Sequence, residues 1–425
     1  MSEVIVIGGG AAGMMAAYAA ASGGHRVRLL EKNEKLGKKI YITGKGRCNV
    51  TNACDLQTYI NNVVSNPKFM YSAFRALEPD ALMSLIESAG TELKTERGNR
   101  VFPVSDHASD ITKALTLLMR NAGAEVLLNT EVKDIRIKDD IPGSANAVSP
   151  GAERGFEVIA EQGKYRRVFA ANAVIVCTGG LSYPSTGSTG DGYRWAERFG
   201  LPLVKCTPAL VPLTVESGML QETEELQGVS LKNVAVRIPE AGFDEQGEML
   251  FTHFGLSGPL ILSASSLISR KLSEGKHFQL EIDLKPALDE ETLDKRILRD
   301  FESARNQSIG NALAGLLISS LRPVILRRCG IDPVKKVHDI SREERSRLVS
   351  VIKHLSYTVT GTRGFNEAII TQGGVSVGAV NAKTMECRNI PGLYFAGEVL
   401  DVDAYTGGFN LQTAFSMGFA AGSSL

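Results

Sequence analysis

The stretch EVIVIGGGAAGMMAAYAAA, residues 3–21, decides the fold. It begins with a β-branched, apolar run, continues with glycines at the spacing G-x-G-x-x-G, and ends in an alanine-rich helical segment. A strand, a glycine turn and a helix in this order form the phosphate-binding unit of dinucleotide folds. Gly8 permits the tight turn, Gly10 lets a pyrophosphate approach the backbone, and Gly13 lets the helix pack on the strand. These three glycines and Ala12 are predicted cofactor contacts.

A second strand is predicted from His25 to Leu30, and it ends at Glu31. A carboxylate at this point accepts hydrogen bonds from both ribose hydroxyls of an adenosine. With Lys32 beside it, Glu31 is therefore expected at the adenosine end of the site. Its charge repels a 2′-phosphate, so FAD or NAD fits this pattern and NADP does not. The helix N-terminus is expected to present free N–H groups to the pyrophosphate.

A polar loop follows, TGKGRCNVTN at residues 43–52. Between Arg26 and Arg47 the chain carries eight basic and two acidic side chains. Glycine-spaced cations with amide neighbours suit an anionic ligand. We therefore expect Gly44, Arg47 and Asn49 to contact the cofactor. The alternative is a solvated surface loop.

Two later segments favour FAD over NAD. Residues 173–180, AVIVCTGG, read as an apolar strand that ends in Thr-Gly-Gly, where the chain returns to the cofactor in flavoproteins. Residues 392–398 form another strand, which ends in Gly and Glu and precedes a glycine turn and a helix from residue 407. A carboxylate there can hold ribityl hydroxyls, and the helix N-terminus can stabilise negative charge on a reduced flavin ring. The further predicted cofactor contacts are Val132, Thr178, Gly179, Gly180, Gly397, Glu398, Gly408, Asn410 and Leu411.

The bulk composition narrows the class of protein. A chain of 425 residues exceeds one compact core, so two or three domains are expected. Lys plus Arg and Asp plus Glu number 47 each, so no overall field draws the protein to nucleic acid or to an anionic membrane. The six cysteines contain no C-x-x-C pair, so no metal site and no disulfide framework is expected. A strand beginning at Val4 leaves no room for a signal peptide, and no apolar stretch reaches the roughly 20 residues of a membrane span, so a cytoplasmic protein is predicted.

Three motifs resemble one known family. They are residues 43–49, residues 251–259, which read FTHFGLSGP, and the stretch 396–412. The chain is similar over nearly its whole length to the BaiN/YhiN-like flavoproteins, which include aminoacetone oxidases. This resemblance implies bound FAD, a Rossmann-like FAD-binding domain built from both chain ends, an inserted β-barrel-like domain and a small helical domain. Members have been associated with reduction of activated double bonds in bile-acid intermediates, with oxidation of aminoacetone and with reduction of a uridine in ribosomal RNA.

The order of the predicted elements agrees with an α/β fold of this kind. Strands and helices alternate at both chain ends, short β-like runs follow, and a helical stretch interrupts them. The predicted domains are an FAD-binding domain over residues 1–190 and 362–425, a β-rich substrate domain over 191–288 and 354–361, and a helical subdomain over 289–353. Residues 141–154, rich in Pro, Gly, Ser and Ala, are predicted to form a loop.

Reduction of a conjugated double bond needs a proton donor beside the flavin. Cys48, His253 and Tyr405 are the candidate catalytic residues, because each lies in a family motif and can donate a proton. Each also has a structural alternative: Cys48 as a packing residue, His253 as a brace of the inserted domain, and Tyr405 as a loop anchor.

The electron partner stays open, because the chain has no second strand, G-x-G-x-x-G and helix unit. NADH or NADPH would therefore bind transiently at the flavin, or oxygen would complete the cycle. Three functions compete: an NAD(P)H-dependent reductase of a conjugated C=C bond in a small molecule, an amine oxidase that makes hydrogen peroxide, and a ribosomal RNA uridine reductase. For the last, residues 322–347 hold eight basic and four acidic side chains, which can cover phosphates or form solvated helix faces. The oligomeric state has no signature in the sequence.

Overall fold

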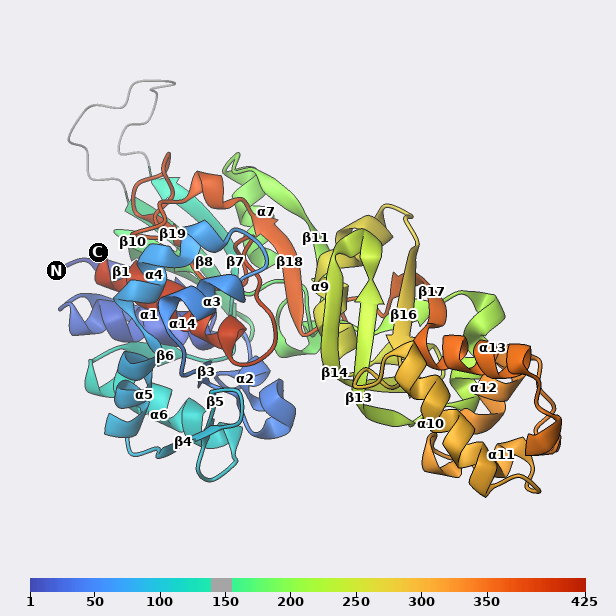
Figure 1. Ribbon diagram of the computed structural model, residues 1–425. Coiled ribbons are helices and arrows are strands. Elements are labelled where there is room, and N and C mark those ends of the chain that lie inside the picture. The colour runs from blue at the N-terminus through green and yellow to red at the C-terminus, as the bar shows by residue number, and fades with distance from the viewer. Residues whose placement is uncertain (139–154) are drawn as a thin grey trace. The chain divides into compact units, whose positions relative to one another are not determined.

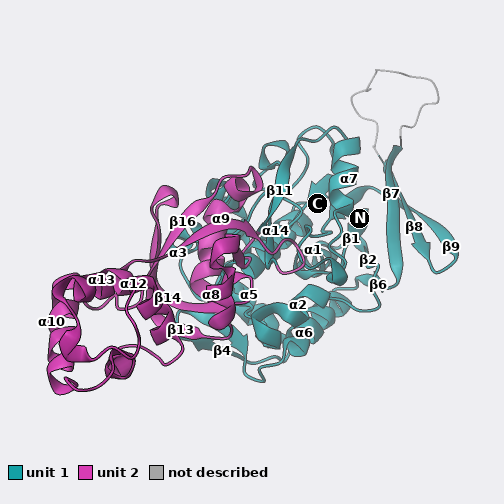
Figure 2. Ribbon diagram, turned by 90° about the vertical axis from the view of Figure 1, so that its right-hand side faces the viewer, with its two compact units in different colours: residues 1–208, 368–425 teal, residues 209–367 magenta. Residues whose placement is uncertain are grey.

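The computed structural model describes residues 1–138 and 155–425, and it divides into two compact units (Figure 2). Unit 1 comprises residues 1–208 and 368–425, and unit 2 comprises residues 209–367. The sequence analysis placed the first boundary after residue 190. The structure places it after 208, because the helix at Asp191–Arg198 packs into the core of unit 1 through Trp195 and Ala196. The loop predicted at residues 141–154 lies outside the described residues.

Unit 1 is built on a parallel sheet of five strands in the order β19-β10-β1-β2-β6 (Figure 1). The first strand of the chain lies at its centre, where Val6 is in register with Leu29 on one side and Ile175 on the other. Four of the five β1 residues are buried, as an apolar run in a parallel sheet predicts. The strands are β1 (Glu3–Ile7), β2 (Arg26–Leu30), β6 (Glu125–Leu127), β10 (Ala173–Val176) and β19 (Leu393–Phe395).

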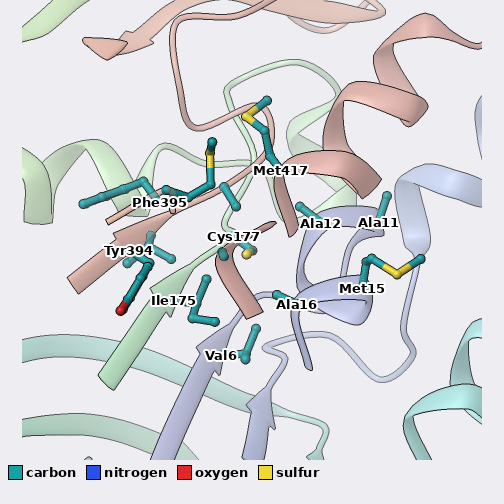
Figure 3. Close-up of a cluster of buried hydrophobic side chains, with 14 of the residues drawn as sticks. Val6, Ala11, Ala12, Met15, Ala16, Ile175, Cys177, Tyr394, Phe395 and Met417 are labelled. Atoms are coloured by element: carbon teal, nitrogen blue, oxygen red, sulfur yellow. The ribbon is translucent and has the colours of Figure 1, made fainter. Parts of the chain in front are cut away.

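Helices α1 (Ala11–Ser22) and α14 (Phe409–Ser423) pack against each other closely. A Cβ atom on Gly418 would lie 2.2 Å from the carbonyl oxygen of Ala12, so only glycine permits this approach. Figure 3 shows part of the buried cluster, which includes Ala12 and Ala16 of α1 and Ile175 and Phe395 of the sheet region. The predicted strand, turn and helix unit is therefore confirmed.

Smaller elements complete unit 1 around this sheet. An antiparallel sheet of β7 (Thr130–Lys138), β8 (Gly155–Gln162) and β9 (Tyr165–Ala171) leads into β10. The other strands are β3 (Thr51–Asn52), β4 (Leu93–Glu96), β5 (Arg100–Pro103), β11 (Leu203–Ala209), which ends at the unit boundary, and β18 (Ile370–Val375). The other helices are α2 (Lys38–Ile42), α3 (Leu56–Asn61), α4 (Met70–Ala76), α5 (Pro79–Ser88), α6 (Ala108–Asn121) and α7 (Asp191–Arg198).

Unit 2 contains a closed barrel in the strand order β12-β15-β14-β13-β16-β17, so the predicted barrel-like insert is confirmed. Its strands are β12 (Leu213–Val215), β13 (Ser230–Ile238), β14 (Phe243–Thr252), β15 (Gly255–Ser257), β16 (Phe278–Asp283) and β17 (Leu355–Thr362). Between β16 and β17 the chain forms α10 (Glu290–Ser303), α11 (Ile309–Ala312), α12 (Leu321–Cys329) and α13 (Arg342–Lys353). Asp289 caps α10, and Ser341 with Glu344 forms a capping box on α13. Two further helices, α8 (Leu220–Glu225) and α9 (Pro259–Ser273), interrupt the segment that the sequence analysis expected to be mainly β.

Candidate functional site

A pocket in unit 1 opens where the carboxyl ends of β1, β2 and β10 meet α1, and this is where ligands bind in open parallel sheets. Eleven of the predicted cofactor contacts line it: Gly8, Gly10, Ala12, Glu31, Lys32, Val132, Thr178, Gly179, Glu398, Asn410 and Leu411. They come from six separate parts of the chain. The fold therefore brings together most of what the sequence analysis assigned to the cofactor.

The glycine turn leaves room for a ligand at the start of α1. Gly8 adopts a φ of 101°, and a Cβ on Gly13 would lie 1.8 Å from the carbonyl oxygen of Gly8. A Cβ on Gly10 would meet no atom within 4 Å, although Gly10 lines the pocket. Gly10 is also the N-cap of α1 and offers no side chain to the first N–H groups of the helix. The open space and the free donors fit a pyrophosphate.

Glu31 is fixed in place at the end of β2. Its side chain is buried, and Oε2 accepts a hydrogen bond from the Gly9 N–H at 2.6 Å. Oε1 accepts from the backbone and the side-chain nitrogen of Asn33 at 2.8 and 2.7 Å. Oε2 accepts only the Gly9 bond among the described residues and keeps acceptor capacity for a ribose hydroxyl. Asn33 also lines the pocket, and the sequence analysis did not identify it.

Lys32 forms an ion pair with Asp191, which also lines the pocket. Its Nζ donates to Asp191 Oδ2 and to Thr189 Oγ1, both at 2.7 Å. Burial alone would raise the pKa of Asp191, but the hydrogen bond and charge of Lys32 and the charge of Arg194 outweigh it and lower that pKa below its ordinary value. This charged pair joins the end of β2 to the start of α7.

Glu398, which also lines the pocket, is the centre of a second polar network. Its Oε2 accepts from Lys39 Nζ at 2.5 Å, and its Oε1 accepts from the Thr371 N–H at 2.9 Å and from the Ser182 hydroxyl. A Cβ on Gly180 would lie 2.4 Å from Thr371 Oγ1, so this glycine makes room for the network. The carboxylate is thus oriented by charge and by hydrogen bonds before any ligand binds.

Two polar atoms of predicted residues are buried without a partner among the described residues. They are Thr178 Oγ1 and Asn49 Oδ1. Since buried polar groups are normally hydrogen-bonded, each such atom needs an explanation. Thr178 lines the pocket, and its hydroxyl is therefore positioned to bond a ligand there. The residues present fit the dinucleotide half of FAD.

Seven predicted contacts do not line the pocket, and five of them are glycines. Gly13 and Gly180 allow the close approaches described above. A Cβ on Gly44 would lie 2.9 Å from the Asn49 nitrogen, one on Gly397 2.8 Å from the Ala12 Cβ, and one on Gly408 2.3 Å from the Thr51 carbonyl. These glycines support the site through packing. Asn49 is the sixth, and its Oδ1 is buried without a hydrogen-bond partner among the described residues.

Arg47 is the seventh, and its side chain contacts two carboxylates and an aromatic ring. Its guanidinium donates to Asp106 Oδ1 at 2.7 Å and to Glu96, and it stacks over the Phe102 ring at 4.2 Å. Hydrogen bonds from Glu96 and Asp106 raise the pKa of Arg47. Two carboxylates therefore engage this cation, and it lies outside the pocket lining.

None of the three candidate proton donors lines this pocket. Cys48 is fully buried, and burial raises the pKa of its thiol to about 12. Tyr405 lies between β19 and α14, where its N–H donates to Asn62 and its carbonyl accepts from Asn410. His253 lies in unit 2 at the exposed turn between β14 and β15, with its ring 5.0 Å from that of Phe254. Burial thus removes Cys48 from contact with a substrate.

Sequence reasoning also missed pocket residues that depend on tertiary contacts. The examples are Asn33, Lys39, Ser188 and Asp191. Lys39 is one of the basic residues between Arg26 and Arg47, and this charge was the only feature of the sequence that pointed to it. Among the described residues no cluster of side chains suits a metal ion, and no helix there has the length and apolar character to cross a membrane.

Comparisons with known proteins agree with this geometry. The family model described as "HI0933-like protein Rossmann domain" matches residues 2–424. The chain is 32% identical to the ribosomal RNA dihydrouridine synthases of Haemophilus influenzae and Escherichia coli, covering 100% of this chain and 98% of each relative. It is 30% identical to the 3-dehydro-bile acid delta(4,6)-reductase of Clostridium scindens, covering 95% of this chain and 93% of the relative.

Among solved structures, a 3-ketosteroid-delta4-(5alpha)-dehydrogenase from Rhodococcus jostii RHA1 is 15% identical and covers 100% of this chain and 96% of its own, at a TM-score of 0.48. The match of the family model over almost every residue confirms the resemblance seen in the sequence motifs. The chain therefore belongs to the HI0933-like family and is an FAD-dependent oxidoreductase.

Proposed function

We propose that this protein reduces a C=C bond conjugated to a carbonyl group, and that its substrate is a uridine of ribosomal RNA. One observation carries the proposal: full-length relatives with different named substrates reduce the same kind of bond. A dihydrouridine synthase saturates the C5–C6 bond of uracil, which is conjugated to the C4 carbonyl. A delta(4,6)-reductase of a 3-dehydro-bile acid acts on a double bond conjugated to a ketone. Uridine is the preferred substrate because two relatives at 32% identity carry that name.

In this proposal the chain's own residues bind and orient, while bound FAD supplies hydride transfer to the double bond. Glu31 would hold the adenosine ribose, and the start of α1 at Gly10 would hold the pyrophosphate. Glu398, which is fixed by its ion pair with Lys39, would hold the ribityl hydroxyls. Reduction also needs one proton at the second carbon. We assign that proton to His253 or Tyr405, since the thiol of Cys48 is buried.

The electron donor in this proposal is NADH or NADPH, bound transiently. Residues Gly187, Ser188 and Asp191 line the pocket beside Lys32, so the glycine-rich segment before α7 belongs to the cofactor site. It does not form a second dinucleotide unit. A nicotinamide donor would therefore have to bind without a dinucleotide-binding unit of its own.

The test is a comparison of ribosomal RNA from cells with and without the gene. We expect dihydrouridine, measured by mass spectrometry of nucleosides, to be lost on deletion and restored by the wild-type gene. Purified protein under anaerobic conditions should be bleached by NADH or NADPH and should then form dihydrouridine in RNA from the deletion strain. Unchanged dihydrouridine in the deletion strain, with no product in vitro, would exclude this substrate.

A steroid-like enone is the second candidate substrate, favoured by the 30% identity to the bile-acid reductase. The same reduced protein should then be reoxidised by a 3-keto-4,6-diene steroid and not by RNA. Hydrogen peroxide formed with aminoacetone, without turnover of either alkene, would instead identify an amine oxidase.

A further inference from the structure

The hairpin formed by β8 and β9 exposes an unusual set of side chains on unit 1. Tyr165 is 76% exposed and begins the edge strand β9 (Figure 2). Lys164, Arg166 and Arg167 flank it and are all exposed. An exposed aromatic ring among cations is a combination that single-stranded nucleic acid recognises, through base stacking and phosphate contacts.

The acids of this three-stranded sheet are already neutralised by other cations. Lys133 pairs with Glu131 at 2.6 Å and with Glu161 at 3.5 Å. The remaining pairs on the sheet are Lys138 with Glu157, Arg136 with Asp134, and Arg198 with Asp134. Among the described residues, no acid pairs with Lys164, Arg166 or Arg167. Glu161 is in register with Arg166, but the three cations outnumber it, so the hairpin tip carries net positive charge although the whole chain is neutral.

This tip lies at the same end of the sheet as the cofactor pocket. Thr130 lines the pocket, Thr130 is in register with Gln162, and Gln162 is in register with Tyr165. Adjacent strands are about 4.8 Å apart, so the Tyr165 backbone is about 10 Å from a pocket residue. An extended polymer bound at the tip would thus pass close to the rim of the pocket.

The basic run of α12 and α13 is a weaker candidate for the same role. Four of its eight cations form ion pairs within unit 2: Arg327 with Glu225, Arg328 with Glu222, Lys335 with Glu344, and Arg345 with Asp294. Three more, Arg322, Lys336 and Arg347, donate to backbone carbonyls. Paired cations attract phosphates less than free ones, because the partner carboxylate cancels their field. The sequence analysis named this run as a phosphate contact or a solvated helix face, whereas the contacts favour the hairpin as the RNA surface.

We propose that the tip of the β8–β9 hairpin, residues 163–167, binds the phosphate backbone of ribosomal RNA and that Tyr165 stacks on an unpaired base. The proposal rests on the proposed function and deepens it, because it names the surface that holds the RNA. Arg166 and Arg167 point to opposite faces of the edge strand, so the two cations can contact phosphates on either side of the stacked base.

The first test replaces the three cations together, as Lys164→Ala, Arg166→Ala and Arg167→Ala. The probe is deproteinised ribosomal RNA from the deletion strain, titrated with holoprotein across a salt series. We expect affinity at about 0.1 M salt to fall by about tenfold or more. The slope of log affinity against log salt should fall by about two, since each phosphate contact on a single strand contributes about 0.7.

A matched control removes three other exposed cations, Lys232, Lys271 and Lys383, none of which has an acid partner among the described residues. This variant should keep the wild-type slope. Tyr165→Ala should weaken binding by about tenfold with an unchanged slope, and Tyr165→Phe should bind like the wild type, because stacking requires only the ring.

The outcomes separate this inference from the proposed function. Support requires that the triple variant loses RNA modification while NAD(P)H still bleaches its flavin at the wild-type rate. If the wild type makes dihydrouridine and the triple variant binds and modifies RNA equally well, the hairpin assignment is wrong and the function stands. If the wild type neither binds nor modifies ribosomal RNA, both fail. Loss of affinity for an acidic protein electron carrier alone would assign the hairpin to that partner and overturn the proposal.

Discussion

Glu31 is the residue whose role follows most directly from sequence and structure together. Its position after β2 was predicted, and its carboxylate is held by Gly9 and Asn33 within the pocket lining. Glu31→Ala should weaken FAD binding by about 1–3 kcal/mol, the usual cost of lost hydrogen bonds to a charged group. Flavin fluorescence during titration of apoprotein measures this directly. The control is Glu34→Ala, which removes an exposed carboxylate paired with Lys38. Equal affinities in both variants would remove Glu31 from the site.

The second prediction concerns Cys48, and the raised pKa of its thiol decides the expected effect on the pH profile. Because burial raises the pKa of this thiol to about 12, it stays almost entirely neutral between about pH 6 and 10. The pH profile of turnover between about 6 and 10 should therefore be the same in Cys48→Ala and in the wild type. Thiol reagents should modify Cys48 only after unfolding. Rapid labelling of Cys48 in the native protein, or a displaced pH profile in the variant, would restore it as an acid candidate.

The parts of the candidate site that are formed within one short stretch of chain could be predicted from the sequence. The G-x-G-x-x-G turn and the glutamate after the next strand follow from local spacing, because both lie within one strand, helix and strand unit. The ion pairs of Arg47 could not be predicted from the sequence, since its partners Glu96 and Asp106 lie 49 and 59 residues away along the chain. Lys39 was missed for the same reason, because its partner Glu398 is 359 residues away.

Among the elements, the α1 and α14 pair links packing to cofactor binding. A Cβ on Gly418 would lie 2.2 Å from the carbonyl oxygen of Ala12, and Ala12 lines the pocket. Gly418→Ala should lower the free energy of unfolding by about 1–3 kcal/mol, as overpacking does, and it should also weaken FAD binding. Denaturant unfolding and flavin titration measure the two effects. Gly315→Ala, where a Cβ meets no atom within 4 Å, is the control and should change neither.

Helix α9 shows why one element escaped prediction. The surrounding strands are short and apolar, and the whole segment was therefore taken as β-rich. Yet the buried positions of α9 recur at helical spacing, and Pro259 occupies the first turn, where proline is tolerated. These positions are Leu260, Ile261, Ala264, Ile268 and Leu272. The helical spacing of the apolar residues was present in the sequence, but the segment was assigned to strands because a barrel was expected there.

At the scale of the whole molecule, each unit has its own hydrophobic core. In unit 2 a buried ion pair joins the end of the barrel strand β16 to the end of α13. Lys353 Nζ lies 2.6 Å from Asp283 Oδ2 and also donates to the carbonyls of Lys285 and Leu288. Removal of one partner from a buried pair leaves an uncompensated charge, which costs about 3–5 kcal/mol. Lys353→Met should therefore destabilise unit 2, whereas Lys295→Met, at the exposed pair with Glu291, should change stability little.

The two cores and the location of the cofactor pocket in unit 1 together predict unfolding in two transitions. FAD at about 100 times its dissociation constant should stabilise unit 1 by about 2.7 kcal/mol, because it binds the folded unit alone. Lys353→Met should lower the other transition and leave the one that responds to FAD in place. Calorimetry of apoprotein and holoprotein, each with and without the substitution, measures the four combinations. A single transition that moves with both FAD and Lys353→Met would show that the units unfold as one cooperative body, and the separate cores would then be a feature of packing without a thermodynamic counterpart.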